Sequence, residues 1–375
     1  MRDLVRAMMN ADAGGLTREH AEAMLTHLAP LTASRAQAAA LLTLLAARKP
    51  SAAFVAGLAE GLLARAVRPK VADSELASRA VDIVGTGGDA AGTVNISTCA
   101  AMVTAACGVP VIKHGNRAVS SQAGSADVLA AMGMPVPASE SDQVTLLERS
   151  GMCFLFAPAY HQATAELGAV RRELAQVGVV TVFNVLGPLT NPARPPFGVF
   201  GAYSAEVATL MAEALRQRDP QTMRRCCVVH GSGGLDEATP LGPFTVQDVR
   251  EGQVQTRTVD PADFGMRRCE LGELKGGDAK TNARLLRAMM AERATHGEAG
   301  GPTEAMLDAV TLNAALALEV AGACNTLGEA VECARVAIRG GATARTMAAM
   351  EEQWMLARAA AARVATGDGG GACHG

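Results

Sequence analysis

A strand, a glycine-rich turn, a helix and a second strand follow one another between residues 81 and 112. Val81 to Val84 forms an apolar strand pattern, the turn Gly85 to Gly88 closes it, and Val109 to Ile112 follows an alanine-rich helix. Strands joined by a crossover helix lie parallel. The succession therefore predicts an α/β fold with a mainly parallel central sheet. Further strand patterns cover residues 153–156, 199–202 and 226–230, and a hairpin pattern covers residues 244–259.

The chain before residue 74 has a helical pattern only. Apolar residues recur at helical spacing from Ala21 to Leu28, and Ser34 with Gln37 has the pattern of a capping box. We therefore predict a small all-helical domain over residues 1–73 and an α/β substrate-binding domain over residues 74–375. We expect the helices near residues 160–182 to pack against the smaller domain, and the tail from about residue 367 to be mobile.

Composition excludes several classes of protein. A chain of 375 residues that is 49% hydrophobic can bury a sizeable core. Its net charge of −3 counts against a nucleic-acid binder. The nine cysteines include no CxxC pair, which favours reduced core thiols over disulfides or zinc. The N-terminus has no apolar signal core, and Gly108 and Pro110 interrupt the apolar run from residue 96 to 112. We predict a cytoplasmic protein without a membrane segment.

The first candidate site is the glycine-rich turn itself. Its glycines let the backbone approach an anion, and the start of the following helix offers amides and hydroxyls to that anion. The pattern is neither the dinucleotide fingerprint nor the P-loop. Simple helix capping would need only one of the polar residues there. The site comprises Gly85, Gly88, Asp89, Thr93, Asn95, Ser97 and Thr98.

A second polar segment, residues 113–121 followed by Gly124 and Ser125, comes directly after the second predicted strand. Ligands bind beyond the carboxyl ends of parallel strands, so we expect both segments at the same rim. Lys113 and Arg117 would supply charge for phosphates, and Asn116 and the serines would supply hydrogen bonds. A solvated loop is the alternative, but two cations beside so many glycines favour a phosphate site.

Two further features concern a metal ion and a carboxylate. Asp236 and Glu237 follow the strand that ends at His230, and a carboxylate pair beside phosphates suggests Mg²⁺; a solvated acidic turn is the alternative. Arg171 lies on a predicted helix and could hold a substrate carboxylate by two parallel hydrogen bonds. The alternative is that Arg171 is an ordinary surface arginine, which is the more usual case for an Arg-Arg-Glu sequence.

Taken together, these segments resemble the anthranilate phosphoribosyltransferases over nearly the whole chain. The matching motifs are GTGGD, NIST, KHGNRAVSSQAGSADVL, VFNVLGPLTNPARP, HGSGGLDE and KGGDAKTNA. The resemblance implies a fold like that of the nucleoside phosphorylases and phosphoribosyltransferases, with a hinge between two domains, and a homodimer. It also implies transfer of the phosphoribosyl group from phosphoribosyl pyrophosphate to the amine of anthranilate, with Mg²⁺, in tryptophan biosynthesis.

The same resemblance implies a role for each matching residue. The metal ligands would be Ser97, Asp236 and Glu237. Anthranilate would contact Gly85, His114, Asn116 and Arg171. Phosphoribosyl pyrophosphate would contact Gly85, Gly88, Asp89, Thr93, Asn95, Ile96, Ser97, Thr98, Lys113, Ser121 and Ser125.

Three departures from the family pattern lie on the acceptor side. The chain has Thr164-Ala165 where the family commonly has Met-Lys, an insertion at residues 175–177, and Val180 where arginine is usual. These departures leave a different aromatic acceptor open. A pyrimidine nucleoside phosphorylase and a non-catalytic nucleic-acid-binding paralogue also remain as alternatives.

The expected chemistry needs no nucleophile and no general base from the protein. Pyrophosphate leaves as a highly charged anion, which fixed donors and a metal stabilise. An aromatic amine is largely unprotonated at neutral pH and can attack directly, so we assign no nucleophile or base. Holding two substrates in one closed cleft supplies much of the remaining rate enhancement.

Overall fold

The protein is described from a computed structural model, which covers residues 2–10, 15–28, 33–48, 50–118, 122–162, 167–291 and 300–365. Seven strands form one sheet in the order β3-β2-β1-β4-β5-β6-β7. The first five in that order are parallel, and β6 and β7 complete the sheet as an antiparallel hairpin. The α/β fold with a mainly parallel sheet is therefore confirmed. The strands are β1 (Val81–Gly85), β2 (Val111–Gly115), β3 (Met152–Phe156), β4 (Phe197–Gly201), β5 (Arg225–His230), β6 (Phe244–Arg250) and β7 (Gln253–Val259).

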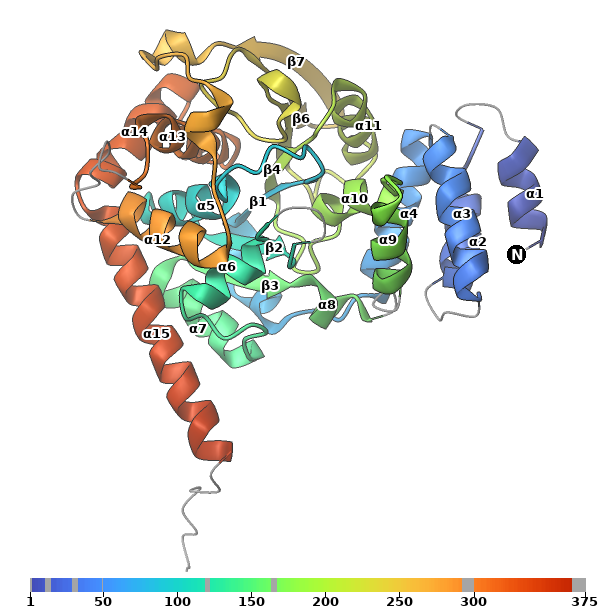
Figure 1. Cartoon of the computed structure of the whole chain (residues 1–375), viewed down its shortest axis with the longest axis horizontal. Helices are drawn as coiled ribbons and strands as arrows, with labels where there is room; N and C mark the ends of the chain where they lie inside the picture. The colour runs from blue at the N-terminus through green and yellow to red at the C-terminus, as the bar shows by residue number, and fades with distance from the viewer. Residues whose placement is uncertain are drawn as a thin grey trace, which may run out of the picture.

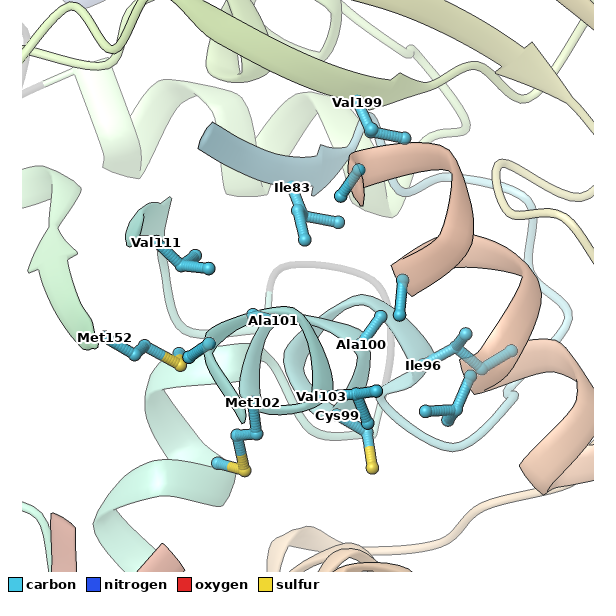
Figure 2. Packing of buried hydrophobic residues seen from close by; sticks show 14 of the residues in the cluster. Ile83, Ile96, Cys99, Ala100, Ala101, Met102, Val103, Val111, Met152 and Val199 are labelled. Carbon is cyan, nitrogen blue, oxygen red and sulfur yellow. The ribbon is translucent and has the colours of Figure 1, made fainter. Parts of the chain in front are cut away.

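One face of the sheet is covered by α5 and the C-terminal helices. Ile83 and Val111 point toward α5, and Val199 of β4 lies on the same face, where α13 packs (Figure 2). The alanines of α5 let it pack closely between the sheet and α13. The buried helix expected after the glycine turn is confirmed. These helices are α5 (Ile96–Ala106), α6 (Ser125–Ala131), α7 (Glu140–Ser150), α12 (Ala279–Met290), α13 (Glu304–Val320), α14 (Leu327–Arg339) and α15 (Ala342–Ala365).

The N-terminal helices lie at one end of the molecule, beyond the opposite face of the sheet (Figure 1). α3 packs against α9, and α4 packs against α10 and α11. One continuous apolar cluster joins Leu41 and Phe54 to Met211 and to Cys226 of β5. The helical end of the chain therefore shares its core with this face of the sheet. The helices are α1 (Arg2–Asn10), α2 (Arg18–Leu28), α3 (Arg35–Ala47), α4 (Ala52–Arg65), α8 (Ala157–Tyr160), α9 (Leu167–Gln176), α10 (Val182–Leu186) and α11 (Ala205–Leu215).

Several local predictions can be checked directly. The capping box at Ser34 is present, since its hydroxyl accepts from the Gln37 amide at 3.3 Å and its own amide donates to the Gln37 side chain at 2.9 Å. The eight cysteines in the described ranges are all free thiols, and five of them are buried. No helix among the described residues is long and apolar enough to cross a membrane. The expected mobile tail lies outside the described residues.

Candidate active site at the carboxyl ends of the parallel strands

The carboxyl ends of β1 and β4 are both glycine, and the acidic turn lies directly on them. Gly85 and Gly201 are paired neighbours in the sheet. A Cβ atom on Gly85 would overlap the Asp236 carboxylate, and one on Gly201 would overlap the Asp236 carbonyl oxygen. Only glycine at both positions lets the backbone approach this closely. The close approach of Asp236 explains why residue 85 is glycine. It also identifies Gly201, which the sequence analysis did not single out.

Two segments about 140 residues apart meet at this point. The amide of Gly87 donates to the Asp236 carboxylate at 2.6 Å, and the amide of Ser97 donates to the Glu237 carboxylate at 2.9 Å. The glycine-rich turn, the start of α5 and the acidic turn therefore form one site. Because the carboxylates bond to backbone amides, their position is fixed by the fold.

The carboxyl groups of this site crowd one another. Burial raises the pKa of Asp236 to about 7, and the nearby Asp89 carboxylate adds to that rise. Burial and Asp236 raise the pKa of Glu237 well above its usual range. A bound cation would relieve both effects. Within the described part of the chain, no group of three or more His, Cys, Asp or Glu side chains is placed to hold a metal ion. The ligand set of Ser97, Asp236 and Glu237 stays a prediction, since Asp236 and Glu237 supply two carboxylates and Mg²⁺ in such sites takes further oxygens from substrate phosphates.

Lys113 does not lie in a loop. Strand β2 continues to Gly115, beyond the predicted end at Ile112, and Lys113 is a strand residue with only 1% of its surface exposed. Its ammonium group donates to the Ile83 carbonyl and lies 3.4 Å from the Ser97 hydroxyl. Burial lowers the pKa of Lys113, while Asp82, Glu237 and Asp236 oppose that shift. The lysine therefore places its charge beneath the site, against the acidic groups.

His114, the next residue of β2, points to the opposite face of the sheet. Its Nδ1 atom lies 3.3 Å from the Gly187 carbonyl oxygen, and its ring meets His161 edge to face at a centroid distance of 5.3 Å. Burial lowers the pKa of His114 to about 3, so the ring is neutral. Its Nε2 atom is buried with no hydrogen-bond partner in the described chain.

The polar segment after β2 is organised by Asp127 of α6. Its carboxylate accepts from the amides of Ala118 and Gly124 at 2.9 and 3.0 Å and pairs with Arg117 at 2.9 Å. Arg117 thus pairs with Asp127 while its side chain stays largely exposed, and a role toward phosphates stays a prediction. Asn116 remains exposed, and Ser125 lies 3.4 Å from its carbonyl oxygen. Ser121 lies outside the described residues.

The start of α5 is fastened from two sides by the Asn95 side chain. Asn95 donates to the Ala123 carbonyl at 3.0 Å and accepts from Asn282 of α12 at 2.8 Å, and it makes no side-chain cap. The polar cluster predicted at this helix start is present. The Asn95 side chain, however, joins the start of α5 to residue Ala123 and to α12. The late KGGDAKTNA segment also fastens the turn, because the Lys275 ammonium donates to the Ala91 carbonyl at 2.6 Å. The other predicted residues of this cluster lie at the same strand end: Gly88 is exposed, Asp89 and Thr93 are half-buried, and Ile96 and Thr98 are buried.

Arg171 is a residue of α9. This helix lies between the N-terminal helices and the sheet (Figure 1). Its guanidinium carbon lies 5.4 Å from the centre of the Phe183 ring. Burial lowers its pKa to about 10, and its Nε atom is buried without a partner in the described chain. A cation placed in this way has donors free for an anionic ligand.

Residues 77–344 match the model of the glycosyl transferase family, a/b domain. The anthranilate phosphoribosyltransferase of Methylobacterium radiotolerans is 42% identical to this chain over 348 residues, which are 92% of this chain and 95% of that relative. The chain belongs to the anthranilate phosphoribosyltransferase family. A member from Desulforudis audaxviator is 41% identical over 341 residues, 90% of this chain and 93% of its own length.

Solved structures of anthranilate phosphoribosyltransferases have the same fold. The enzyme of Thermus thermophilus superposes with a TM-score of 0.81 at 36% identity, over 94% of this chain and 99% of that one. The enzyme of Saccharomyces cerevisiae in complex with PRPP and Mg gives a TM-score of 0.76 at 24% identity, over 95% and 98% of the two chains. The fold predicted from the family resemblance is thus confirmed.

The departures from the family pattern are placed largely at the surface. The insertion at residues 175–177 prolongs the end of α9, and the side chains of Val177 and Val180 are 74% and 46% exposed. Gly178 ends the helix with a φ of 79°, as glycine commonly does. Thr164 and Ala165 lie outside the described residues. Residues 175 and 176 are the last two of α9, and Arg171, about one turn earlier, is half-buried beside Phe183.

Two asparagines support the family site from beneath, and the sequence analysis missed both. Asn313 of α13 accepts from the Ala238 amide at 3.2 Å and donates to the Ala238 carbonyl at 2.8 Å, which fixes the chain just after the acidic pair. Asn191 donates to the buried Asp82 carboxylate at 2.9 Å and to the Ile112 carbonyl at 2.8 Å. Two sequence features could have identified them. Asn313 lies within a mainly apolar helical pattern, and Asn191 lies within the turn Thr190-Asn191-Pro192.

Proposed function

We propose that this chain transfers the 5-phosphoribosyl group from phosphoribosyl pyrophosphate to the amine of anthranilate and releases pyrophosphate, in tryptophan biosynthesis. The observation that carries the proposal is the acidic pair, which is seated on Gly85 and Gly201 and bonded to the amides of Gly87 and Ser97. Membership of the family supports the same reaction.

The donor would bind at the glycine-rich turn. Gly87 and Gly88 are exposed and would let the pyrophosphate approach the backbone of the turn closely. Asp236, Glu237 and Ser97 would hold Mg²⁺, which supplies positive charge against the leaving pyrophosphate. The amides of Gly87 and Ser97 hold the two carboxylates in place, so little reorganisation is needed when charge develops.

The acceptor would bind on the side of α9 and α10. Arg171 would grip the carboxylate of anthranilate, and the neutral His114 would offer its unpartnered Nε2 atom. Asn116 is exposed near the end of β2 and would contact the same ligand. These contacts aim the amine at the ribose, and the amine attacks without a protein base.

Three finer statements are part of the proposal. The two domains, residues 1–73 and 74–375, would close on each other about a hinge, which brings donor and acceptor together. The enzyme would act as a homodimer. It would work in the cytoplasm, where its thiols stay reduced.

Pyrophosphate release from phosphoribosyl pyrophosphate, measured with a panel of aromatic amines, tests the proposal. We expect release that depends on Mg²⁺ and on anthranilate, with aniline a poor acceptor because it lacks the carboxylate. If another amine of the panel is a better acceptor than anthranilate, the assignment of anthranilate as the acceptor is wrong. Cleavage of a pyrimidine nucleoside by inorganic phosphate, without use of phosphoribosyl pyrophosphate, would overturn the proposal.

A further inference from the structure

Arg171 differs from the other partly buried arginines in what holds it. Arg225 pairs with Asp248, and Arg257 pairs with Glu319. Arg218 donates to the Leu189 carbonyl. Arg171 has no acidic partner among the residues the structure describes, and its guanidinium carbon lies 5.4 Å from the centre of the Phe183 ring. A ring attracts a cation through its π face without neutralising it. The charge of Arg171 therefore remains available to a carboxylate.

Phe183 is itself firmly placed. It lies on the short helix α10, and only 7% of its surface is exposed. The side-chain amide of the next residue, Asn184, lies near the point where a Cβ on Gly88 would be. One short helix thus carries adjacent side chains to the arginine and to the glycine-rich turn.

We propose that Phe183 is a positioning residue, whose ring holds the Arg171 guanidinium in the orientation that binds the acceptor carboxylate. This inference rests on the proposed function. An acidic residue in place of the ring would also orient the arginine, but it would compete with the substrate carboxylate for the same donors. An aromatic ring orients the planar group and leaves its edge free.

A double-mutant cycle on Phe183→Leu and Arg171→Ala tests the inference. We expect Phe183→Leu to lower kcat/KM for anthranilate about three- to thirtyfold, the range for a desolvated cation–ring contact. The loss should fall on KM for anthranilate, while KM for the donor and activity toward aniline stay unchanged. In the Arg171→Ala background, Phe183→Leu should change anthranilate kcat/KM less than about twofold. Phe183→Tyr, which keeps the ring, should restore most of the activity.

Two results separate failure of the inference from failure of the proposed function. If Phe183→Leu costs the same factor in both backgrounds, or affects aniline equally, then the ring only fills space and the inference is wrong. If Arg171→Ala leaves anthranilate use unchanged, the acceptor assignment itself fails. Thermal unfolding checks that the variants are folded, and Phe183→Met replaces Phe183→Leu if the latter is not. An anthranilate titration followed by fluorescence gives the same comparison without turnover.

Discussion

Gly201 has no room for a side chain, because the carbonyl of Asp236 lies where its Cβ would be. We predict that Gly201→Ala pushes the acidic turn off the strand end. Overpacking of this kind costs about 1–3 kcal/mol of stability. Displacing the Asp236 and Glu237 carboxylates should also lower kcat/KM at least about tenfold. Gly272→Ala is the matched control, since nothing lies within 4 Å of a Cβ at that position. Equal activity in the two variants would show that the close approach is not needed.

His114 makes stability depend on pH. Burial, aided by His161, lowers the pKa of His114 from 6.5 to about 3. Below about pH 6.5 the unfolded chain binds a proton that the folded chain refuses, so stability is lost as the pH falls toward 3. The contribution is at most about 1.4 kcal/mol per pH unit.

We therefore predict a shallower pH dependence for His114→Gln. Urea unfolding between about pH 7 and about pH 4.5 measures the free energy of unfolding of both proteins. The wild-type value should fall more steeply with falling pH. Parallel curves for the two proteins would contradict the buried neutral state of this histidine.

At the scale of elements, α12 is tied to the start of α5 through one side chain. Asn282 donates to Asn95, and its own oxygen accepts from the Gly277 amide at 2.8 Å. We predict that Asn282→Ala raises KM for phosphoribosyl pyrophosphate severalfold. It should destabilise the fold by about 1–3 kcal/mol, because the Gly277 amide and the Asn95 side-chain oxygen, both half-buried, lose their partner. KM for anthranilate should stay close to the wild-type value. An equal rise in both KM values would mean that the tie is not specific to the donor side.

The elements themselves were largely predictable from local pattern. The strand, glycine turn and alanine-rich helix between Val81 and Ala106 follow from periodicity and turn chemistry. The end of β2 was not predictable, because Lys113 and His114 are polar and suggest a loop. They are strand residues because tertiary contacts satisfy their polar groups. The Lys113 ammonium donates to the Ile83 carbonyl, and the His114 amide donates to the Asp82 carboxylate.

Contacts between distant residues were the other limit. The motifs located the candidate site residues, yet the partners of those residues lie far along the chain. Asp236 meets Gly87 across 149 residues, and Asn191 meets Asp82 across 109. No periodicity in the sequence encodes such pairings. Arg117 shows the same limit at short range, since its pairing with Asp127, ten residues along the chain, was not predicted.

At the scale of the whole molecule, the helical end and the sheet share an apolar cluster on one face. The proposed hinge would act where α9 and α10 of the larger domain pack against α3 and α4 (Figure 1). We predict a homodimer. Size-exclusion chromatography coupled to light scattering should give twice the 38.4 kDa mass of the chain. A single-chain mass at working concentration would contradict the dimer and leave the proposed reaction standing.

Anthranilate-dependent pyrophosphate release by wild type and by a folded Asp236→Asn, Glu237→Gln double variant tests the central claim most directly. The buried acidic pair, fixed by the amides of Gly87 and Ser97, is the feature on which the proposed site depends. We predict that the wild type consumes one anthranilate for each pyrophosphate released. The double variant should lose at least about a hundredfold in kcat, with its thermal unfolding temperature kept or raised because the crowded charges are gone. Near-normal turnover by the folded double variant at ordinary Mg²⁺ would contradict the account.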